Sequence, residues 1–139
     1  NILESKFPQP RRIFVHIKPE ILHQSVSYLV NELNFTHLTT ITGLDLKNEF
    51  EVIYHINDGQ NELSIKIRIP RDKPNVPTIT DIIPGAALYE RELHDLFGIV
   101  AEGHPELKRI ILPDNWPEGV YPMRKEWTIE KLREKLDKL

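Results

Sequence analysis

The sequence between residues 62 and 69 reads Glu62-Leu63-Ser64-Ile65-Lys66-Ile67-Arg68-Ile69, so apolar and polar side chains alternate without a break. A period of two residues places successive side chains on opposite faces of an extended strand. One face is therefore expected to lie against a core and the other to face water, which is typical of antiparallel sheets covered on one side. The stretch predicts a strand in such a sheet.

Two more strands are predicted just before it. Residues 49–56 show the same alternation, and residues 37–42 form a shorter run that ends at Gly43. Between the second and third strands, Asn57-Asp58-Gly59 favours a hairpin, because Asp and Gly tolerate the positive φ of a tight turn. The three segments predict an antiparallel meander.

The helices are expected on one face of this sheet. Apolar residues recur at helical spacing over 20–33, where Asn34 is a plausible end, and a strand is predicted before them at 12–17. A second helix is predicted over 85–97, with Gly98 in the left-handed conformation that ends many helices. The fold class is therefore α+β, an antiparallel sheet meander with helices packed on one face.

Prolines mark two segments without regular structure. Residues 70–84 contain four prolines and are expected to form a loop rather than a strand. Residues 102–127 contain four more, together with Trp116, Tyr121 and Trp127, and show no periodicity. Such a segment is expected to be an extended proline-rich C-terminal arm whose aromatic side chains need a surface to bury against.

The chain is accordingly divided into two parts. Residues 1–101 are expected to form the α+β domain, and residues 102–139 an extended docking arm and a short terminal helix. Thr128 is a candidate N-cap of that helix. The length of 139 residues fits one compact domain with an appended segment.

The composition excludes several classes of site. The chain contains no cysteine, which rules out disulfides, thiolate zinc sites, cysteine nucleophiles and cysteine-ligated iron–sulfur clusters. A net charge of -3 does not indicate binding of nucleic acid or anionic lipid. No apolar run approaches the ~20 residues of a membrane span, and residues 1–10 lack the apolar stretch of a signal peptide. The glycines form no dinucleotide-binding fingerprint.

Charged residues gather on the second predicted helix at Glu90, Arg91, Glu92 and Asp95. One interpretation is a stand-alone enzyme with an acid–base site that uses Glu90, Glu92 or His94. The other is a solvated helix face with local ion pairs, because Arg91 and Asp95, like Glu90 and His94, are four residues apart. The sequence favours the solvated face.

Two further features suggest binding but are weak signals. His94 and His104 lack the two-histidine spacing of a helical zinc site, so a metal site is not favoured. His104, which precedes Pro105, is expected to bind a backbone group or a partner. The basic pair Arg124-Lys125 has no glycine-rich phosphate loop near it, and we expect it to pair with carboxylates of a neighbouring protein.

The stretch Tyr89-Glu90-Arg91-Glu92-Leu93-His94-Asp95-Leu96-Phe97-Gly98-Ile99 resembles the signature of the thirty-kilodalton subunit family of respiratory complex I. The resemblance continues through Gly103-His104-Pro105 and Leu107-Lys108-Arg109-Ile110-Ile111-Leu112-Pro113, and it ends at Pro122-Met123-Arg124-Lys125. It covers about residues 37–127, and the order and spacing of these elements make it specific.

The resemblance implies membership of a multisubunit redox complex. Complex I members usually have Trp two residues before the first Glu of the signature, where this chain has Leu88, and the run at 117–122 looks more like the hydrogenase branch. The first expectation is therefore a non-catalytic accessory subunit of a membrane-bound hydrogenase or sulfur-reducing complex. A subunit of an NADH- or F420H2-type quinone oxidoreductase is the alternative, and an interaction module without redox links is a third hypothesis.

The family likeness also implies partners and a location. It implies a large subunit of the NiFe-hydrogenase or 49 kDa type as the main partner, with the NiFe centre and iron–sulfur clusters in partner subunits and no cofactor in this chain. It implies a peripheral position on the cytoplasmic side of the membrane, without direct insertion and without nucleic acid. The residues expected to contact a partner are Glu90, Arg91, Glu92, Asp95, His104, Pro105, Trp116, Tyr121, Arg124 and Lys125.

Overall fold

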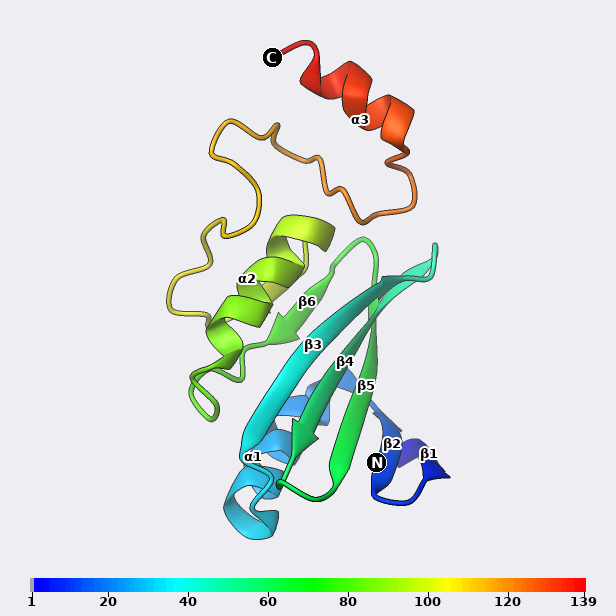
Figure 1. Ribbon diagram of the computed structural model, residues 1–139, viewed down its shortest axis with the longest axis vertical. Coiled ribbons are helices and arrows are strands. Elements are labelled where there is room, and N and C mark those ends of the chain that lie inside the picture. The colour runs from blue at the N-terminus through cyan, green and yellow to red at the C-terminus, as the bar shows by residue number, and fades with distance from the viewer. Residues whose placement is uncertain (1) are drawn as a thin grey trace.

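Five strands form one sheet in the order β1-β2-β5-β4-β3 (Figure 1). The structure, a computed structural model, describes residues 2–139. The strands are β1 (Ile2–Gln9), β2 (Arg12–Ile17), β3 (His37–Asp45), β4 (Glu49–Asn57) and β5 (Glu62–Pro70). Antiparallel pairing joins β3 to β4 and β4 to β5, so the predicted meander is confirmed.

The sheet also contains a parallel pair that the sequence did not predict. Strand β2 pairs with β5 in parallel, with Val15 opposite Ile65, and β1 pairs with β2 as an antiparallel hairpin. A parallel neighbour needs a crossover connection, and the chain after β2 passes through the first helix to reach β3 at the far edge. The fold is therefore α+β with a mixed, mostly antiparallel sheet.

The helices lie close to their predicted positions. They are the 3₁₀ turn η1 (Pro19–Ile21), α1 (Leu22–Leu33), α2 (Ala86–Phe97) and α3 (Ile129–Leu136). Asn34 and Gly98 have φ values of 58° and 75°, so both predicted helix ends are confirmed. Gly98 is left-handed as expected, and Asn34 adopts the same conformation. The Thr128 side chain accepts a hydrogen bond from the Lys131 N–H at 3.4 Å, which confirms it as the N-cap of α3.

The prediction that residues 70–84 contain no strand is wrong for Pro70, the last residue of β5, and for three residues further along the chain. Strand β6 (Asn75–Pro77) pairs in parallel with β7 (Val100–Glu102), with Val76 opposite Ala101. The flanking hydrogen bonds use the carbonyl of Pro74 and the N–H of Thr78, and a proline ring removes neither group. Prolines at these places therefore permit a short ladder.

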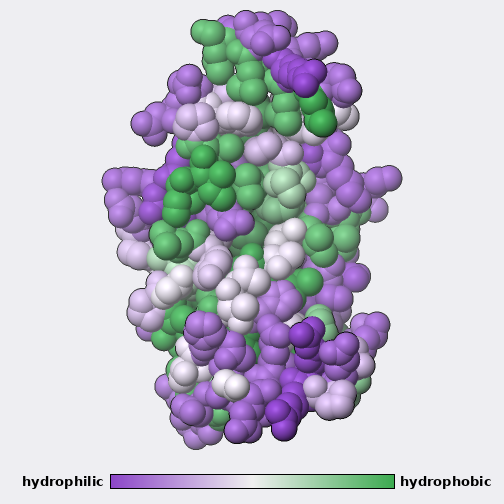
Figure 2. Space-filling view, viewed as in Figure 1, coloured by the Kyte–Doolittle hydropathy of each residue, from purple (hydrophilic) through white to green (hydrophobic). Residues whose placement is uncertain are grey.

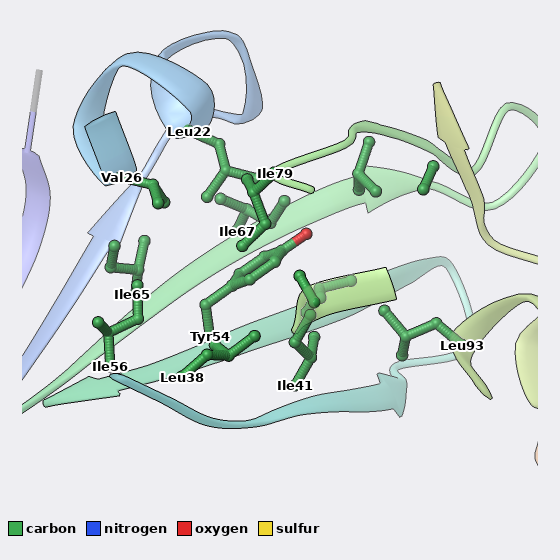
Figure 3. Close-up of a cluster of buried hydrophobic side chains, with 14 of the residues drawn as sticks. Leu22, Val26, Leu38, Ile41, Tyr54, Ile56, Ile65, Ile67, Ile79 and Leu93 are labelled. Carbon is green, nitrogen blue, oxygen red and sulfur yellow. The ribbon is translucent and has the colours of Figure 1, made fainter. Parts of the chain in front are cut away.

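The core lies between the sheet and the helices (Figure 3). Tyr54, Ile65 and Ile67 point from β4 and β5 toward Leu22 and Val26 of α1. All four isoleucines and leucines of the predicted 62–69 stripe are buried, as the alternation indicates. The opposite face is less wet than predicted, because Glu51 and Ser64 are also buried there.

Helix α2 packs close to β3 because β3 carries a glycine at the contact. A Cβ atom on Gly43 would lie 2.6 Å from Cε2 of Phe97 and 2.9 Å from Cδ2 of Leu93. Any larger residue there would push α2 away from the sheet. The close approach fixes the position of α2, which carries four of the ten predicted contact residues.

Candidate interaction site on helix α2 and the arm

The segment of residues 103–128 between β7 and α3, called the arm below, is held against α2 by a buried carboxylate. Asp95 is 3% exposed. Its Oδ2 accepts hydrogen bonds from three successive backbone N–H groups, those of Ile110, Ile111 and Leu112, at 2.9, 2.8 and 3.1 Å. Burial alone would raise the pKa of Asp95, but these donors outweigh it and hold the pKa below its usual value.

Arg91, one turn earlier on α2, binds the backbone of the two arm residues that precede Ile110. Its Nε donates to the Lys108 carbonyl at 2.9 Å and its Nη2 to the Arg109 carbonyl at 2.7 Å. The predicted ion pair between Arg91 and Asp95 is therefore wrong, because both side chains bind the backbone of the arm instead of each other. Side chains four residues apart on a helix can form an ion pair. Here the C=O and N–H groups of the arm lie within hydrogen-bonding distance and bind both side chains instead.

Glu90 faces inward and fastens the loop before α2. It is 1% exposed. Its Oε1 accepts from the Ile79 N–H at 2.9 Å and its Oε2 from the Thr78 hydroxyl at 2.7 Å. Burial raises the pKa of Glu90, although these two donors and the nearby His104 act in the other direction. The predicted solvated face is thus wrong for both Glu90 and Asp95.

His104 ties the start of the arm to α2, and its side chain is also buried. Its Nδ1 accepts from the Glu106 N–H at 2.9 Å, while Nε2 lies 3.0 Å from the Ala87 carbonyl, to which it donates. Nε2 is also 3.9 Å from Oε2 of Glu90. The expectation that His104 binds a backbone group is confirmed.

The Tyr54 hydroxyl belongs to the same buried region. Burial and the neighbouring charge of Glu90 both raise the pKa of Tyr54 well above its usual value. Figure 3 shows this hydroxyl at the end of the side chain that crosses the core. Glu90 is enclosed, and both of its oxygens accept hydrogen bonds from within the chain.

The end of the arm caps the C-terminus of α2. The Met123 N–H donates to the Leu96 carbonyl at 3.0 Å, and Arg124 Nε donates to the Phe97 carbonyl at 2.7 Å. These carbonyls belong to the last turn, where a helix has no partners of its own. The Arg124 guanidinium also lies 5.1 Å from the ring centroid of Phe50 and 4.5 Å from that of Tyr121. Its contacts are therefore within the chain.

Asp45, at the end of β3, holds the residue after Arg124. Its Oδ2 accepts from the Lys125 N–H at 2.8 Å, and its Oδ1 accepts from Arg71 Nη1 at 2.5 Å and from the Lys47 N–H at 2.8 Å. Arg71 also pairs with Glu126. The backbone of Lys125 is thus fixed, while its side chain remains exposed.

The predicted contact residues differ in how far a partner can reach them. The side chains of Glu90, Asp95 and His104 are buried, whereas Pro105 and Lys125 are exposed. The partly buried ones are Arg91, Glu92, Trp116, Tyr121 and Arg124. Trp116 donates from Nε1 to the Val120 carbonyl at 2.8 Å, within the arm. The Trp116 residue also lines a cavity of about 700 Å³ between α2 and the arm.

Sequence reasoning missed three exposed aliphatic residues beside this site, Leu88, Ile110 and Ile111. Their apolar character was visible, but their exposure depends on how Asp95 orients the arm. Among residues 2–139, no group of His, Asp or Glu is arranged to hold a metal ion. In the same part of the chain, no helix is both long and apolar enough to cross a membrane.

Comparison with known proteins identifies the family. Residues 15–133 match the family described as "Respiratory-chain NADH dehydrogenase, 30 Kd subunit". The chain belongs to this family. The resemblance seen in residues 37–127 is therefore confirmed, and the match to the 30 kDa family extends over α1 and most of α3 as well.

Relatives within the 30 kDa family are subunits of oxidoreductases. The chain is 35% identical over 130 residues to a subunit of the F(420)H(2) dehydrogenase of Methanosarcina mazei, covering 91% of this chain and 82% of the relative. It is 38% identical over 119 residues to a subunit of the NADH-quinone oxidoreductase of Roseiflexus castenholzii, covering 81% and 67%. This protein is thus similar to subunits of two kinds of respiratory-type complex.

Two solved structures show the same fold. A chain of the membrane-bound sulfane sulfur reductase, an archaeal respiratory membrane complex, matches 98% of this chain and 83% of its own length, with a TM-score of 0.85 and 31% identity. A trypsin-resistant fragment (1–134) of Nqo5 matches 75% of this chain and 89% of its own length, with a TM-score of 0.66 and 28% identity. The 30 kDa family is therefore a family of subunits of oxidoreductase complexes.

Proposed function

We propose that this chain is an accessory subunit, with no redox centre of its own, of a membrane-bound oxidoreductase complex. In that complex it binds and stabilises the large subunit of the NiFe-hydrogenase or 49 kDa type. The iron–sulfur clusters and the NiFe centre, in partner subunits, would carry the electrons. The absence of cysteine supports this division, because iron–sulfur clusters are held by thiolates.

The observation that carries the proposal is the exposed apolar surface on α2, the arm and α3. Figure 2 shows hydrophobic residues gathered over α2 with the neighbouring arm, and again over α3. Met123, Ile129 and Leu139 are exposed, and Leu132 and Leu136 of α3 between them are partly exposed. Apolar surface of this kind marks an interface, since exposure to water is unfavourable.

The match to the sulfane sulfur reductase supports the choice of complex. It covers 98% of this chain with a TM-score of 0.85, so the likeness in fold extends to the residues of the arm. We therefore favour a hydrogenase or sulfur-reductase type, with a peripheral position on the cytoplasmic side of the membrane. The names of the curated relatives favour an F420H2- or NADH-type quinone oxidoreductase as the second candidate. The division into 1–101 and 102–139 stays a prediction.

Binding to the large subunit of the same organism's complex tests the proposal. The tagged chain, a version that ends at residue 127, and Ile129→Asp are each mixed with the purified large subunit, with Lys135→Ser on the polar face of α3 as control. We expect the wild-type chain and the control to form a stoichiometric complex. Loss of α3 or a charge at Ile129 should weaken it at least about tenfold. A wild-type chain that does not bind contradicts the proposal.

A further inference from the structure

Three neighbouring aliphatic side chains surround an acidic one on the outer side of α2. Leu88 and Glu92 lie one turn apart on the helix, and Ile110 and Ile111 come from the arm; these four residues are called the α2 patch. Leu88, Ile110 and Ile111 are 57%, 40% and 53% exposed. The patch lines a shallow pocket of about 250 Å³, which Gly85 and Tyr89 complete.

The way the arm is held explains why these side chains are displayed. Arg91 binds the carbonyls of residues 108 and 109, and Asp95 binds the N–H groups of residues 110–112. All of these hydrogen bonds are to backbone atoms, so they do not depend on the Ile110 and Ile111 side chains. Those side chains are left free to face outward. Arg91 and Asp95 of α2 thus hold the arm so that its apolar side chains remain exposed on this chain.

The charge on the patch indicates what the surface fits. Within residues 2–139, the Glu92 carboxylate has neither an ion pair nor a hydrogen bond. The nearest cation along α2, Arg91, is occupied by the arm. A partner that covers the aliphatic side chains would also enclose this carboxylate, and an enclosed carboxylate needs a cation or strong donors.

We propose that the α2 patch is a second contact surface for the large subunit, an inference that rests on the proposed function. The partner segment that fits it presents an aliphatic side chain to the pocket and an arginine or lysine to Glu92. Buried aliphatic contacts supply affinity, and the cation sets the register of docking. The surface is separate from α3, so the large subunit would be held at two places on this chain.

Three variants of the full-length chain test the patch against the purified large subunit of the same complex. They are Leu88→Ser, Ile111→Ser and Glu92→Gln. The control is Leu33→Ser at the end of α1, where the side chain is 47% exposed. We expect the first two to weaken binding at least about tenfold and the control less than about twofold. Glu92→Gln should weaken binding at low salt and reduce its salt dependence.

The outcomes separate this inference from the proposed function. If the wild-type chain does not bind the large subunit, both are overturned. If it binds, and loss of α3 weakens it while the patch variants bind like wild type, only the patch is overturned. If sedimentation shows a wild-type dimer that Ile111→Ser dissociates, the occupant is a second copy and the inference is wrong. Melting temperatures within about 2 °C of wild type exclude unfolding as the cause, which is expected because the altered aliphatic side chains are exposed and Glu92 is only partly buried.

Discussion

Glu90 and Asp95 are buried carboxylates on the same helix, and their surroundings act on them in opposite directions. Three backbone N–H groups meet Asp95, so its pKa is lowered and the charge is stabilised. Burial dominates at Glu90, so its pKa is raised and the charge is costly. The two residues therefore have different roles, Asp95 as an anchor for the arm and Glu90 as a tie to the loop before α2.

Replacing Glu90 with Gln should be tolerated, whereas Glu90→Ala should lower the free energy of unfolding by about 2–4 kcal/mol. Gln still accepts from the Ile79 N–H and can donate to the Thr78 hydroxyl. Ala leaves the buried Ile79 N–H without this partner, and the Thr78 hydroxyl keeps only its hydrogen bonds with Thr80. Because the folded pKa is raised above the ordinary 4.5, the wild type should lose stability relative to Glu90→Gln as pH rises from 4.5 through the folded pKa. Urea unfolding at several pH values measures this. Equal losses in both variants would contradict it.

Asp45 should govern part of the acid stability. Burial acts to raise its pKa, but Arg71 and the N–H groups of Lys125 and Lys47 lower the pKa from 3.8 to about 2. Its contribution is therefore complete above pH 3.8 and is lost as the pH falls through about 2, roughly 2 kcal/mol in all. Acid titrations of wild type and Asp45→Asn should converge over this window. Parallel curves would show that Asp45 does not carry the effect.

At the scale of elements, the arm and α2 stabilise each other at the helix end. Gly98 has a φ of 75°, and a Cβ there would lie 2.6 Å from Cε2 of Tyr121 and 2.7 Å from Nη2 of Arg124. The glycine thus serves two purposes, to end α2 and to let the arm approach. Because Arg124 packs at this helix end and binds the Phe97 carbonyl, we expect it to contribute to the stability of the free chain.

Gly98→Ala should destabilise the chain by about 2–4 kcal/mol, because both strain and steric overlap are introduced. The matched control is Gly119→Ala, since Gly119 has a φ of 74° and no atom within 4 Å of the added Cβ. The control should cost only the backbone strain, about 1 kcal/mol. Thermal or urea unfolding gives both values. Equal costs would mean that the arm is not packed on Gly98.

Asp95→Asn should release the arm from α2 without unfolding the sheet. The three N–H groups all bind one oxygen of the Asp95 carboxylate. The Asn amide has no negative charge, so its single oxygen is a weaker acceptor for them. Trypsin should then cleave after Lys108 and Arg109 several times faster than in the wild type, because cleavage requires a locally opened backbone. Asp114→Asn, an exposed residue of the arm, is the control. Unchanged cleavage would show that Asp95 does not hold the arm.

At the scale of the whole molecule, the chain has a packed core and a side that carries exposed apolar residues. Figure 1 shows α3 beyond the arm and away from the sheet, while α1 covers the sheet at the other end. Core packing is therefore complete without α3, and many of the exposed apolar residues lie on α2, the arm and α3. This distribution is expected of a subunit that folds by itself and becomes fully covered on assembly.

The isolated chain should be colourless and free of stoichiometric metal. It has no cysteine, and its described residues contain no metal-binding cluster. Elemental analysis and a visible spectrum of the purified chain measure this. Nickel, iron or zinc at one atom per chain, retained after chelator treatment, would contradict the prediction and reopen the assignment of the redox centres.

The sequence by itself determined the features that depend on neighbouring residues. The alternation over 62–69 predicted a buried strand face, and Asn34 and Gly98 predicted two helix ends, because side-chain period and φ preference are local properties. The order of motifs along the chain also determined the family. These predictions needed no knowledge of which distant segments meet.

Only the tertiary structure decided the partners of the polar groups and the pairing of β2 with β5. Asp45 and Lys125 are 80 residues apart, and nothing in either local sequence predicts their hydrogen bond. Arg91 and Asp95 have the spacing of an ion pair, yet the backbone of the arm lies within reach and binds both. The choice depends on which N–H and C=O groups the packed elements bring to a buried charge, because such a charge must find a partner wherever the fold provides one.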